Sequence, residues 1–391
     1  MSDAATTARA SLAIAGGAPV SPTPIPMIAV EITPADADAA VKTLRSGMLA
    51  QGPNVAAFEA RFAQITGAAH AAACANGTCA LQLAYEPLIK PGDDVLCPGW
   101  TYIATASMIA ARGARPIFCD ADPETYNLDA HDAASRITPA TTAIVVTHLY
   151  GAPADIDAVQ TLAQAHGLNV IYDAAQAHGA TWRGAGLGAF GDAVTYSFYA
   201  TKNMTTGEGG MVTTNDESLD RAVRLLRSHG ESAKYVHESI GYNYRMSDVE
   251  AALGLSQLDR LLASTQRRQA NAAALDAAIE QIPGLTEPRV TPGAEHAYHL
   301  YAVRLEEAAF RVDRDGFAEA LRAEGVQCAV HYPTPTHRQP VFASLPPTDL
   351  PVCDRLARSL VCVPVHPSLT EAQVARIGEA LAKVADAYAA S

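Results

Sequence analysis

TYSFYATKNMTTGEGG, residues 195–210, is the most informative stretch of this sequence. An apolar run that predicts a strand leads into Lys202, and a glycine-rich return follows. The neighbours of Lys202 are small and neutral, and such surroundings lower the pKa of an amine and favour a neutral nucleophile. Ser197 can supply a hydroxyl to a phosphate, and the glycines let the backbone turn tightly beside a ligand. Most loop lysines are simply solvated, but this pattern predicts a reactive lysine at the end of a strand.

Upstream, residues 170–179 read VIYDAAQAHG, and Asp173 closes an apolar run that also predicts a strand. A carboxylate in such a place is costly unless it has a cationic partner. A protonated pyridine nitrogen is one such partner, and ligands of open α/β sheets bind at the carboxyl ends of strands. The alternative is that Asp173 only caps a following helix.

Two further segments carry polar residues at element boundaries. Residues 75–80, ANGTCA, predict a turn followed by a helix start at Thr78, where exposed N–H groups can hold a phosphate. An ordinary turn and cap remain the alternative. Residues 241–248, GYNYRMSD, place Asn243 and Arg245 among aromatic residues before a predicted helix cap at Ser247. The alternative there is a surface loop.

The middle of the chain alternates short apolar runs with helical stretches. Predicted strands such as 94–97, 116–119, 143–147 and 169–172 are separated by predicted helices such as 78–89, 103–111 and 154–166. Uniformly apolar strands suit a sheet that is buried on both faces. The alternation therefore predicts an α/β fold with a three-layer α/β/α large domain around a mostly parallel sheet.

The domain organisation follows from length and from the later pattern. A chain of 391 residues exceeds the size of about 250–300 residues at which single cores stop growing. We expect an N-terminal arm over 1–30, a large domain over 31–255 and a small α+β domain over 256–391. A helix starting at Thr33-Pro34 and stopping near Gly47 is predicted, and a bent helical stretch over 247–282 would join the domains. The small domain should contain strands at 298–304 and 327–331.

Composition excludes several classes of protein. The formal net charge of −13 argues against nucleic-acid and acidic-membrane surfaces. Seven scattered cysteines without a CxxC pair suit free thiols in a reducing compartment. Neither a signal peptide nor an apolar run of about 18 residues is visible, and we expect a soluble, cytoplasmic protein without a metal site.

Together these segments resemble the DegT/DnrJ/StrS-type sugar aminotransferases, a branch of the fold-type I pyridoxal 5′-phosphate (PLP) enzymes. The resemblance extends from about Ile25 to the final helix. The stretches that carry it, in the order typical of the family, are NGTCAL (76–81), CPGWTYIATA (97–106), DADPETYNLD (120–129), YDAAQAHGA (172–180), SFYATKNMTTGEGGM (197–211), GYNYRMSD (241–248), HYPTPTHRQP (331–340) and PVHPSLTEAQ (364–373).

The resemblance implies a role for each matching residue. Lys202 would be the Schiff-base lysine and would shuttle the proton at the reacting carbon, and Asp173 would pair with the pyridinium nitrogen. Gln176 would lie near the ring hydroxyl and Tyr102 would stack on the ring. Phosphate contacts would come from Gly77, Thr78 and Ser197. Asn243 would reach the phosphate in the neighbouring subunit, because family members build their sites across a homodimer.

The implied reaction is transamination of a nucleotide-linked keto-sugar. L-Glutamate would donate the amine and leave as 2-oxoglutarate, and the product would be an amino sugar. The family's dehydratase branch has histidine in place of the lysine, so Lys202 favours aminotransfer. The GYNYRMSD form resembles members that aminate C4, which suggests a 4-keto-6-deoxyhexose. Candidates for the sugar or diphosphate end are Arg245, His331, Tyr332 and His337.

Three alternatives remain open from sequence. The substrate could be a keto-cyclitol such as an inosose. The chain could be a regulatory or binding homologue without catalysis, although Lys202, Asp173, Gln176 and Ser197 are all retained. It could also be a cysteine-dependent PLP lyase, although no cysteine lies in an obviously electropositive loop.

Overall fold

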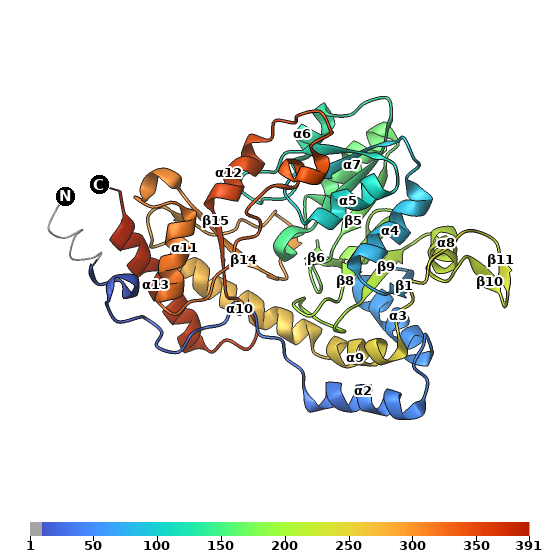
Figure 1. Ribbon diagram of the computed structural model, residues 1–391, viewed down its shortest axis with the longest axis horizontal. Helices are drawn as coiled ribbons and strands as arrows, with labels where there is room; N and C mark the ends of the chain where they lie inside the picture. The colour runs from blue at the N-terminus through green and yellow to red at the C-terminus, as the bar shows by residue number, and fades with distance from the viewer. Residues whose placement is uncertain (1–9, 391) are drawn as a thin grey trace.

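The central element of the fold is a mixed sheet with helices on both faces (Figure 1). A computed structural model describes residues 10–390. The sheet has the order β1-β9-β8-β5-β4-β2-β3, in which β2, β3, β4, β5 and β8 run parallel and β9 runs antiparallel to its neighbours β1 and β8. The strands are β1 (His70–Cys74), β2 (Asp94–Pro98), β3 (Arg115–Cys119), β4 (Thr141–Thr147), β5 (Asn169–Asp173), β8 (Ala193–Ser197) and β9 (Gly210–Thr214).

Two hydrophobic clusters cover the two faces of this sheet. Alternate residues of β4 belong to different clusters, with Ala143 and Val145 in one and Ile144 and Val146 in the other. The first cluster contains residues of α4 (Gly77–Leu88), α5 (Ile103–Ala111), α8 (Glu217–Arg227) and α12 (Pro351–Ser359). The second contains residues of α3 (Pro53–Thr66), α6 (Ala130–Ser135), α7 (Ile156–His166) and α9 (Asp248–Leu258). The predicted three-layer α/β architecture is confirmed.

The first long helix begins and ends at the residues predicted from the sequence. In α2 (Pro34–Ser46), Thr33 and Asp36 form a reciprocal capping box, and Pro34 occupies the first turn. Gly47 ends the helix in the left-handed conformation with φ 76°.

The predicted bent helix is two helices. α9 ends at Leu258 and α10 (Leu261–Ile279) starts after a short break. α10 leads to the C-terminal part of the chain, where a third cluster lies between α10, α11 (Arg314–Ala323), α13 (Glu371–Tyr388) and a sheet of the order β12-β14-β15 (Figure 1). These strands are β12 (Leu285–Thr286), β14 (Tyr301–Leu305) and β15 (Leu360–Val363).

The strand predicted at 327–331 is wrong. This segment makes only an isolated bridge between Ala329 and Cys362, and β15 is the strand that pairs with β14. The backbone hydrogen bonds of the segment are divided, since Gln327 donates to Ile25 and Ala329 donates to Cys362. With its partners on two different segments, the stretch forms no continuous ladder.

Within the predicted N-terminal arm, residues 1–9 lie outside the described residues, and residues 10–30 contact the C-terminal part of the chain. Leu12 and Ile25 are buried in the third cluster, and Ile25 forms a parallel bridge with Val326. The buried carboxylate of Glu324 accepts hydrogen bonds from the backbone N–H groups of Ala13 and Val20. Because Glu324 satisfies these two donors, it anchors the segment to the C-terminal part.

Short elements complete the described chain. The remaining strands are β6 (Thr181–Trp182), β7 (Ala185–Gly186), β10 (Glu231–Ala233), β11 (Val236–His237) and β13 (Ala294–Glu295). Short 3₁₀ helices are η1 (Ala13–Ala15), η2 (Leu149–Gly151), η3 (Leu187–Ala189), η4 (Glu307–Ala309), η5 (Thr336–Arg338) and η6 (Pro340–Phe342). Across residues 10–390, no helix combines the length and apolar character needed to cross a membrane.

Candidate active site

A cavity of about 760 Å³ lies at the carboxyl ends of β4, β5 and β8. Such an edge of a parallel sheet is where α/β proteins bind ligands. The cavity brings together nine of the residues predicted from sequence, namely Gly77, Thr78, Tyr102, Asp173, Gln176, Ser197, Lys202, His331 and Tyr332.

Asp173 is the last residue of β5, and its carboxylate is buried at the cavity wall. Burial raises its pKa, while hydrogen bonds from the Thr105 hydroxyl and the Ala175 N–H and the nearby Lys202 charge act in the opposite direction. β5 is followed by turns rather than a helix, so the alternative of a simple helix cap is wrong. A cationic ligand atom in the cavity would supply the charge partner that a buried carboxylate requires.

Lys202 lies on another wall of the same cavity, in the loop between β8 and β9. Its backbone N–H donates to the Tyr199 carbonyl, which holds a tight turn directly after the strand. Burial lowers the pKa of the Lys202 amine to about 8, and attraction to Asp173 only partly opposes this effect. Near physiological pH the amine is therefore neutral far more often than an ordinary lysine, and the neutral form is the one that attacks an aldehyde.

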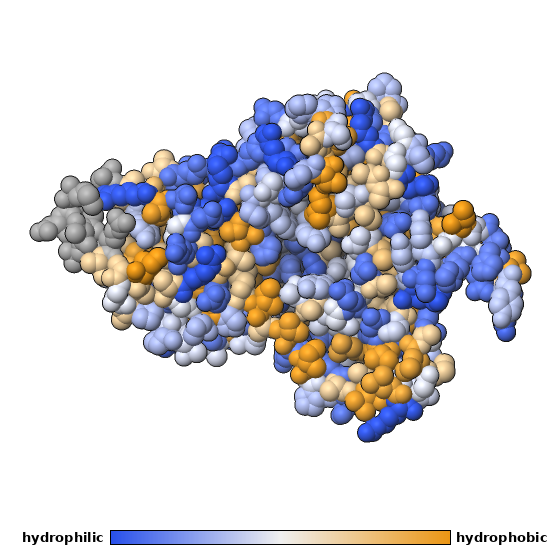
Figure 2. All heavy atoms as spheres, viewed as in Figure 1, coloured by the Kyte–Doolittle hydropathy of each residue, from blue (hydrophilic) through white to orange (hydrophobic). Residues whose placement is uncertain are grey.

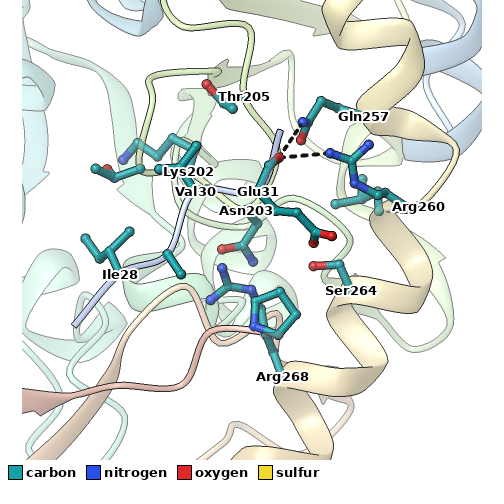
Figure 3. A pocket seen from close by; sticks show the side chains of 14 residues that line it. Ile28, Val30, Glu31, Lys202, Asn203, Thr205, Gln257, Arg260, Ser264 and Arg268 are labelled. Atoms are coloured by element: carbon teal, nitrogen blue, oxygen red, sulfur yellow. Dashed lines mark hydrogen bonds between the residues drawn. The ribbon is translucent and has the colours of Figure 1, made fainter. Parts of the chain in front are cut away.

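Behind Lys202 lies a smaller pocket of about 40 Å³, lined by residues 28–31 and by α9 and α10 (Figure 3). Figure 3 shows Lys202 and Arg260 on opposite sides of this pocket. Arg268 is buried there, its Nη1 donates to the Tyr298 carbonyl, and burial lowers its pKa to about 10. The surroundings of Lys202 on this side therefore also disfavour additional positive charge.

The lowered pKa of Lys202 predicts its pH-dependent reactivity. In the apoprotein, acylation of Lys202 by a small reagent should reach half its maximal rate near pH 8. A peptide spanning residues 199–206 should require a pH near the ordinary lysine value of 10.5. The lowered pKa also affects stability. Between about pH 8 and pH 10.5 the Lys202 amine is protonated in the unfolded chain but not in the folded one, so the free energy of unfolding of the apoprotein should rise with pH over this range. Quantitative mass spectrometry of the modified peptide measures the midpoint, and a value near 10.5 in the folded protein would contradict the prediction.

The start of α4 fits a phosphate group. Gly77 and Thr78 lie in the first helical turn, where N–H groups have no acceptor within the helix, and Asn76 caps the helix by accepting from Cys79 N–H. A Cβ on Gly77 would lie 2.6 Å from the Ser197 Cβ, so only glycine allows the helix start and the end of β8 to approach this closely. Two backbone donors and the Ser197 hydroxyl thus meet at the positive end of a helix dipole.

Polar and aromatic side chains complete the cavity. The Gln176 Oε1 accepts from the Tyr150 N–H at 2.7 Å, and its Nε2 donates to the Tyr332 hydroxyl at 3.0 Å. The Tyr102 ring is 57% exposed and lies 6.2 Å from the Tyr332 ring, measured between centroids. An exposed aromatic face at a cavity wall suits stacking on a planar ligand.

Three predicted residues do not line this cavity. Asn243 is exposed and forms a backbone bridge with Ser228, and Arg245 forms one with Cys74. His337 lies elsewhere, with its Nε2 3.5 Å from Asp354 Oδ1. Any role of these residues in binding therefore requires a group outside the cavity or a second chain.

The sequence reasoning missed several cavity residues. Thr101 and Thr147 line the cavity close to Asp173, and Tyr199, Glu208 and His299 contribute other parts of the wall. Thr101 and Thr105 stand four residues apart beside the aromatic residues Trp100 and Tyr102, and this helical spacing was an available signal. No local signal pointed to His299, which reaches the cavity only through tertiary folding.

The described cysteines do not support thiol chemistry. Six of the seven are buried, and only Cys79 is partly exposed and lines the cavity. Burial raises the pKa of the Cys79 thiol, and a protonated thiol is a poor nucleophile. The site therefore favours amine chemistry at Lys202 over a cysteine-dependent reaction.

Comparison with known proteins agrees with this geometry. The family described as DegT/DnrJ/EryC1/StrS aminotransferases matches residues 30–382. UDP-N-acetyl-3-dehydro-alpha-D-glucosamine 3-aminotransferase of Acidithiobacillus ferrooxidans is 41% identical over 325 residues, covering 82% of this chain and 86% of that protein. GDP-perosamine synthase of Caulobacter vibrioides is 40% identical over 337 residues, covering 85% and 90%.

Solved structures give the same result. DesV of S. venezuelae, in complex with a ketimine intermediate, superimposes with a TM-score of 0.89 at 36% identity, covering 93% of this chain and 99% of that one. Structural neighbours include both a PLP form and a pyridoxamine phosphate form. The cavity has a buried carboxylate, a lysine with a lowered pKa and a helix start that fits a phosphate. The chain belongs to the DegT/DnrJ/EryC1/StrS family of PLP-dependent aminotransferases.

Proposed function

We propose that the protein transfers an amino group from L-glutamate to the keto carbon of a nucleotide-linked sugar, giving an amino sugar and 2-oxoglutarate. The observation that carries this proposal is that Asp173 and Lys202 line one cavity, one as a buried carboxylate and the other as an amine with a lowered pKa. Bound PLP supplies an electrophilic carbon and a ring that withdraws electrons from the substrate carbon.

The residues of the cavity have distinct roles in this proposal. Lys202 holds PLP covalently and, when its amine is released, moves the proton at the reacting carbon. Asp173 would keep the ring nitrogen protonated, and Gln176 would approach the ring hydroxyl. Tyr102 would stack on the ring, and Gly77, Thr78 and Ser197 would hold the phosphate. His331 and Tyr332 also line the cavity and would contact the sugar.

The position of the keto group has two candidates. The 241–248 stretch favours a 4-keto-6-deoxyhexose, as inferred from sequence. A 3-keto sugar is the second candidate, because the name of the A. ferrooxidans relative specifies position 3. Both candidates use the same cavity chemistry and differ only in which ring carbon faces Lys202.

A substrate panel tests this proposal. Purified holoenzyme with L-glutamate should aminate at least one 3-keto or 4-keto hexose linked to UDP, GDP or dTDP, as read by product mass and by 2-oxoglutarate release. An inosose and the same sugars without nucleotide are the comparison substrates. Turnover with inososes alone would replace the proposal with the keto-cyclitol reaction, and binding without turnover of any ketone would favour a regulatory role.

We also propose that the active unit is a homodimer. In α2, Asp36 and Thr43 are buried, whereas Val41 and Leu44 are exposed, as is Met48 just beyond the end of the helix. Figure 2 shows apolar residues gathered over this region of the surface. An outward apolar helix face of this kind marks a protein interface. A second chain on this face could bring Asn243 and Arg245 to the neighbouring cavity.

Leu44→Asp tests this dimer. Sedimentation should give the unsubstituted protein a mass of twice the 40.9 kDa chain, and Leu44→Asp should shift it toward the mass of one chain, because a charge would be buried without a partner. Val341→Asp, at another exposed apolar residue, should leave the mass unchanged. A monomeric unsubstituted protein with full activity would contradict the proposal.

A further inference from the structure

Three buried threonine hydroxyls form a chain that ends on Asp173. Thr147 Oγ1 lies 2.8 Å from Thr101 Oγ1, which lies 3.1 Å from Thr105 Oγ1. Thr105 Oγ1 lies 2.7 Å from Asp173 Oδ2. All four residues are buried. The four side chains therefore expose little surface even at the cavity wall, and hydrogen bonds to a charged group are stronger in such places than in open solvent.

The direction of the hydrogen bonds follows from chemistry. An ionised carboxylate only accepts, so the Thr105 proton must point to Asp173. The Thr105 oxygen can then only accept, which turns the Thr101 proton toward it, and Thr101 in turn accepts from Thr147. Each hydroxyl donates once toward the carboxylate, and donors that polarise one another in series strengthen the last bond.

Helix capping does not explain this arrangement. The N-cap of α5 is Tyr102, and it makes no side-chain capping bond. A threonine inside a helix commonly donates to a carbonyl one turn earlier, whereas Thr105 donates to Asp173. Thr336 donates to the Thr101 carbonyl at 2.7 Å and fixes the middle of the chain from the C-terminal part of the protein.

We propose that Thr105 is a positioning residue that keeps Asp173 ionised and oriented toward the ring nitrogen of PLP, and that Thr101 and Thr147 orient the Thr105 hydroxyl. The inference rests on the proposed role of Asp173. A donor that serves only the charged form of a carboxylate favours ionisation and opposes the effect of burial. The Ala175 N–H holds the other oxygen, Oδ1, so that the two bonds together fix the plane of the carboxylate.

The charged and titratable neighbours of Asp173 set its pH behaviour. Lys202 is the cation that acts on Asp173, and its pKa of about 8 keeps it largely charged in acid. Tyr85 and Tyr332 also face Asp173, but their pKa values are raised by burial and both stay neutral below pH 8. PLP affinity should therefore fall as pH falls through the pKa of Asp173, because the protonated acid no longer pairs with a pyridinium.

Thr105→Val is the test, because valine keeps the shape and removes the donor. Holoenzyme is dialysed at a series of pH values, and the PLP that remains bound is measured by visible absorbance. Relative to the unsubstituted protein, Thr105→Val should raise the PLP dissociation constant about tenfold at neutral pH. The loss of PLP affinity at acidic pH should also begin at a higher pH, because loss of the Thr105 donor raises the pKa of Asp173.

Matched variants separate positioning from packing. Thr105→Ser keeps the hydroxyl and should retain both affinity and pH midpoint, and Thr147→Val should shift both in the same direction as Thr105→Val but less. Thr213→Val, at a buried threonine on β9 whose hydroxyl donates to the Val194 carbonyl, should change neither.

Three results would overturn the inference. The first is a Thr105→Val protein with unchanged affinity and midpoint. The second is a weakened affinity without a shifted midpoint, and the third is an equal defect in Thr105→Ser, since each of these two would indicate a packing role only. If Thr105→Val does not fold, the Thr147→Val midpoint decides in the same way. Asp173→Asn in the same assay tests the underlying role, because unchanged PLP binding there would refute Asp173 as the nitrogen partner independently of the threonines.

Discussion

Lys202→Ala is expected to lower kcat for sugar amination on the order of 10³-fold or more. The variant loses both the amine that holds PLP covalently and the base that moves the proton at the reacting carbon. PLP can still bind through its phosphate and ring contacts, so the visible band of lysine-linked PLP should disappear while some free cofactor stays bound. Steady-state rates and absorbance spectra of the purified variant measure these effects.

Lys90→Ala is the control for this variant, since Lys90 is an exposed lysine and does not line the cavity. It should keep both the band and the rate. Two results would contradict the role of Lys202, namely a Lys202→Ala protein that keeps the lysine-linked band, or one that keeps a kcat within about tenfold of that of the unsubstituted enzyme. Either result would show that a different amine binds PLP covalently and moves the proton.

Asp173→Asn is expected to have the second largest effect. Asparagine keeps the size of the side chain but removes the charge that pairs with the ring nitrogen in a buried site. Loss of one partner of a buried ion pair costs about 3–5 kcal/mol. If this whole cost raises the free energy of the transition state, kcat falls on the order of 10²–10⁴-fold. Rates at saturating PLP separate this effect from weakened cofactor binding.

The matched control is Asp192→Asn. Asp192 accepts from the Val170 N–H at the opposite end of β5, away from the cavity. Its replacement should change kcat by no more than about twofold, as expected for substitutions outside special environments. Wild-type turnover in Asp173→Asn would contradict the assignment of Asp173.

Much of the fold could be predicted because its signals are local. The Thr33–Asp36 capping box, the left-handed Gly47 and the apolar runs of the parallel strands act through neighbours in sequence. Lys202 and Asp173 were accessible for the same reason, since Asp173 ends an apolar strand, Lys202 follows another within one short loop, and the ends of parallel strands meet at one edge.

The features that were missed depend on distant partners. Residues 327–331 read as a strand, but Gln327 pairs with the N-terminal segment while Ala329 pairs with Cys362. The burial of Leu12 depends on Glu324 more than 300 residues away, since that carboxylate holds the neighbouring Ala13 N–H. The threonine chain likewise joins the ends of β2 and β4 to α5, and no periodicity within one segment reveals such a contact.

Borohydride reduction of the holoenzyme, followed by proteolysis and mass spectrometry, tests most directly which residue carries PLP. Reduction makes the link between amine and cofactor permanent, so the modified residue can be read from fragment masses. The structure predicts one PLP-sized addition per chain, located on Lys202. An addition on a different lysine, or active holoenzyme without any addition at Lys202, would contradict the assignment of the site.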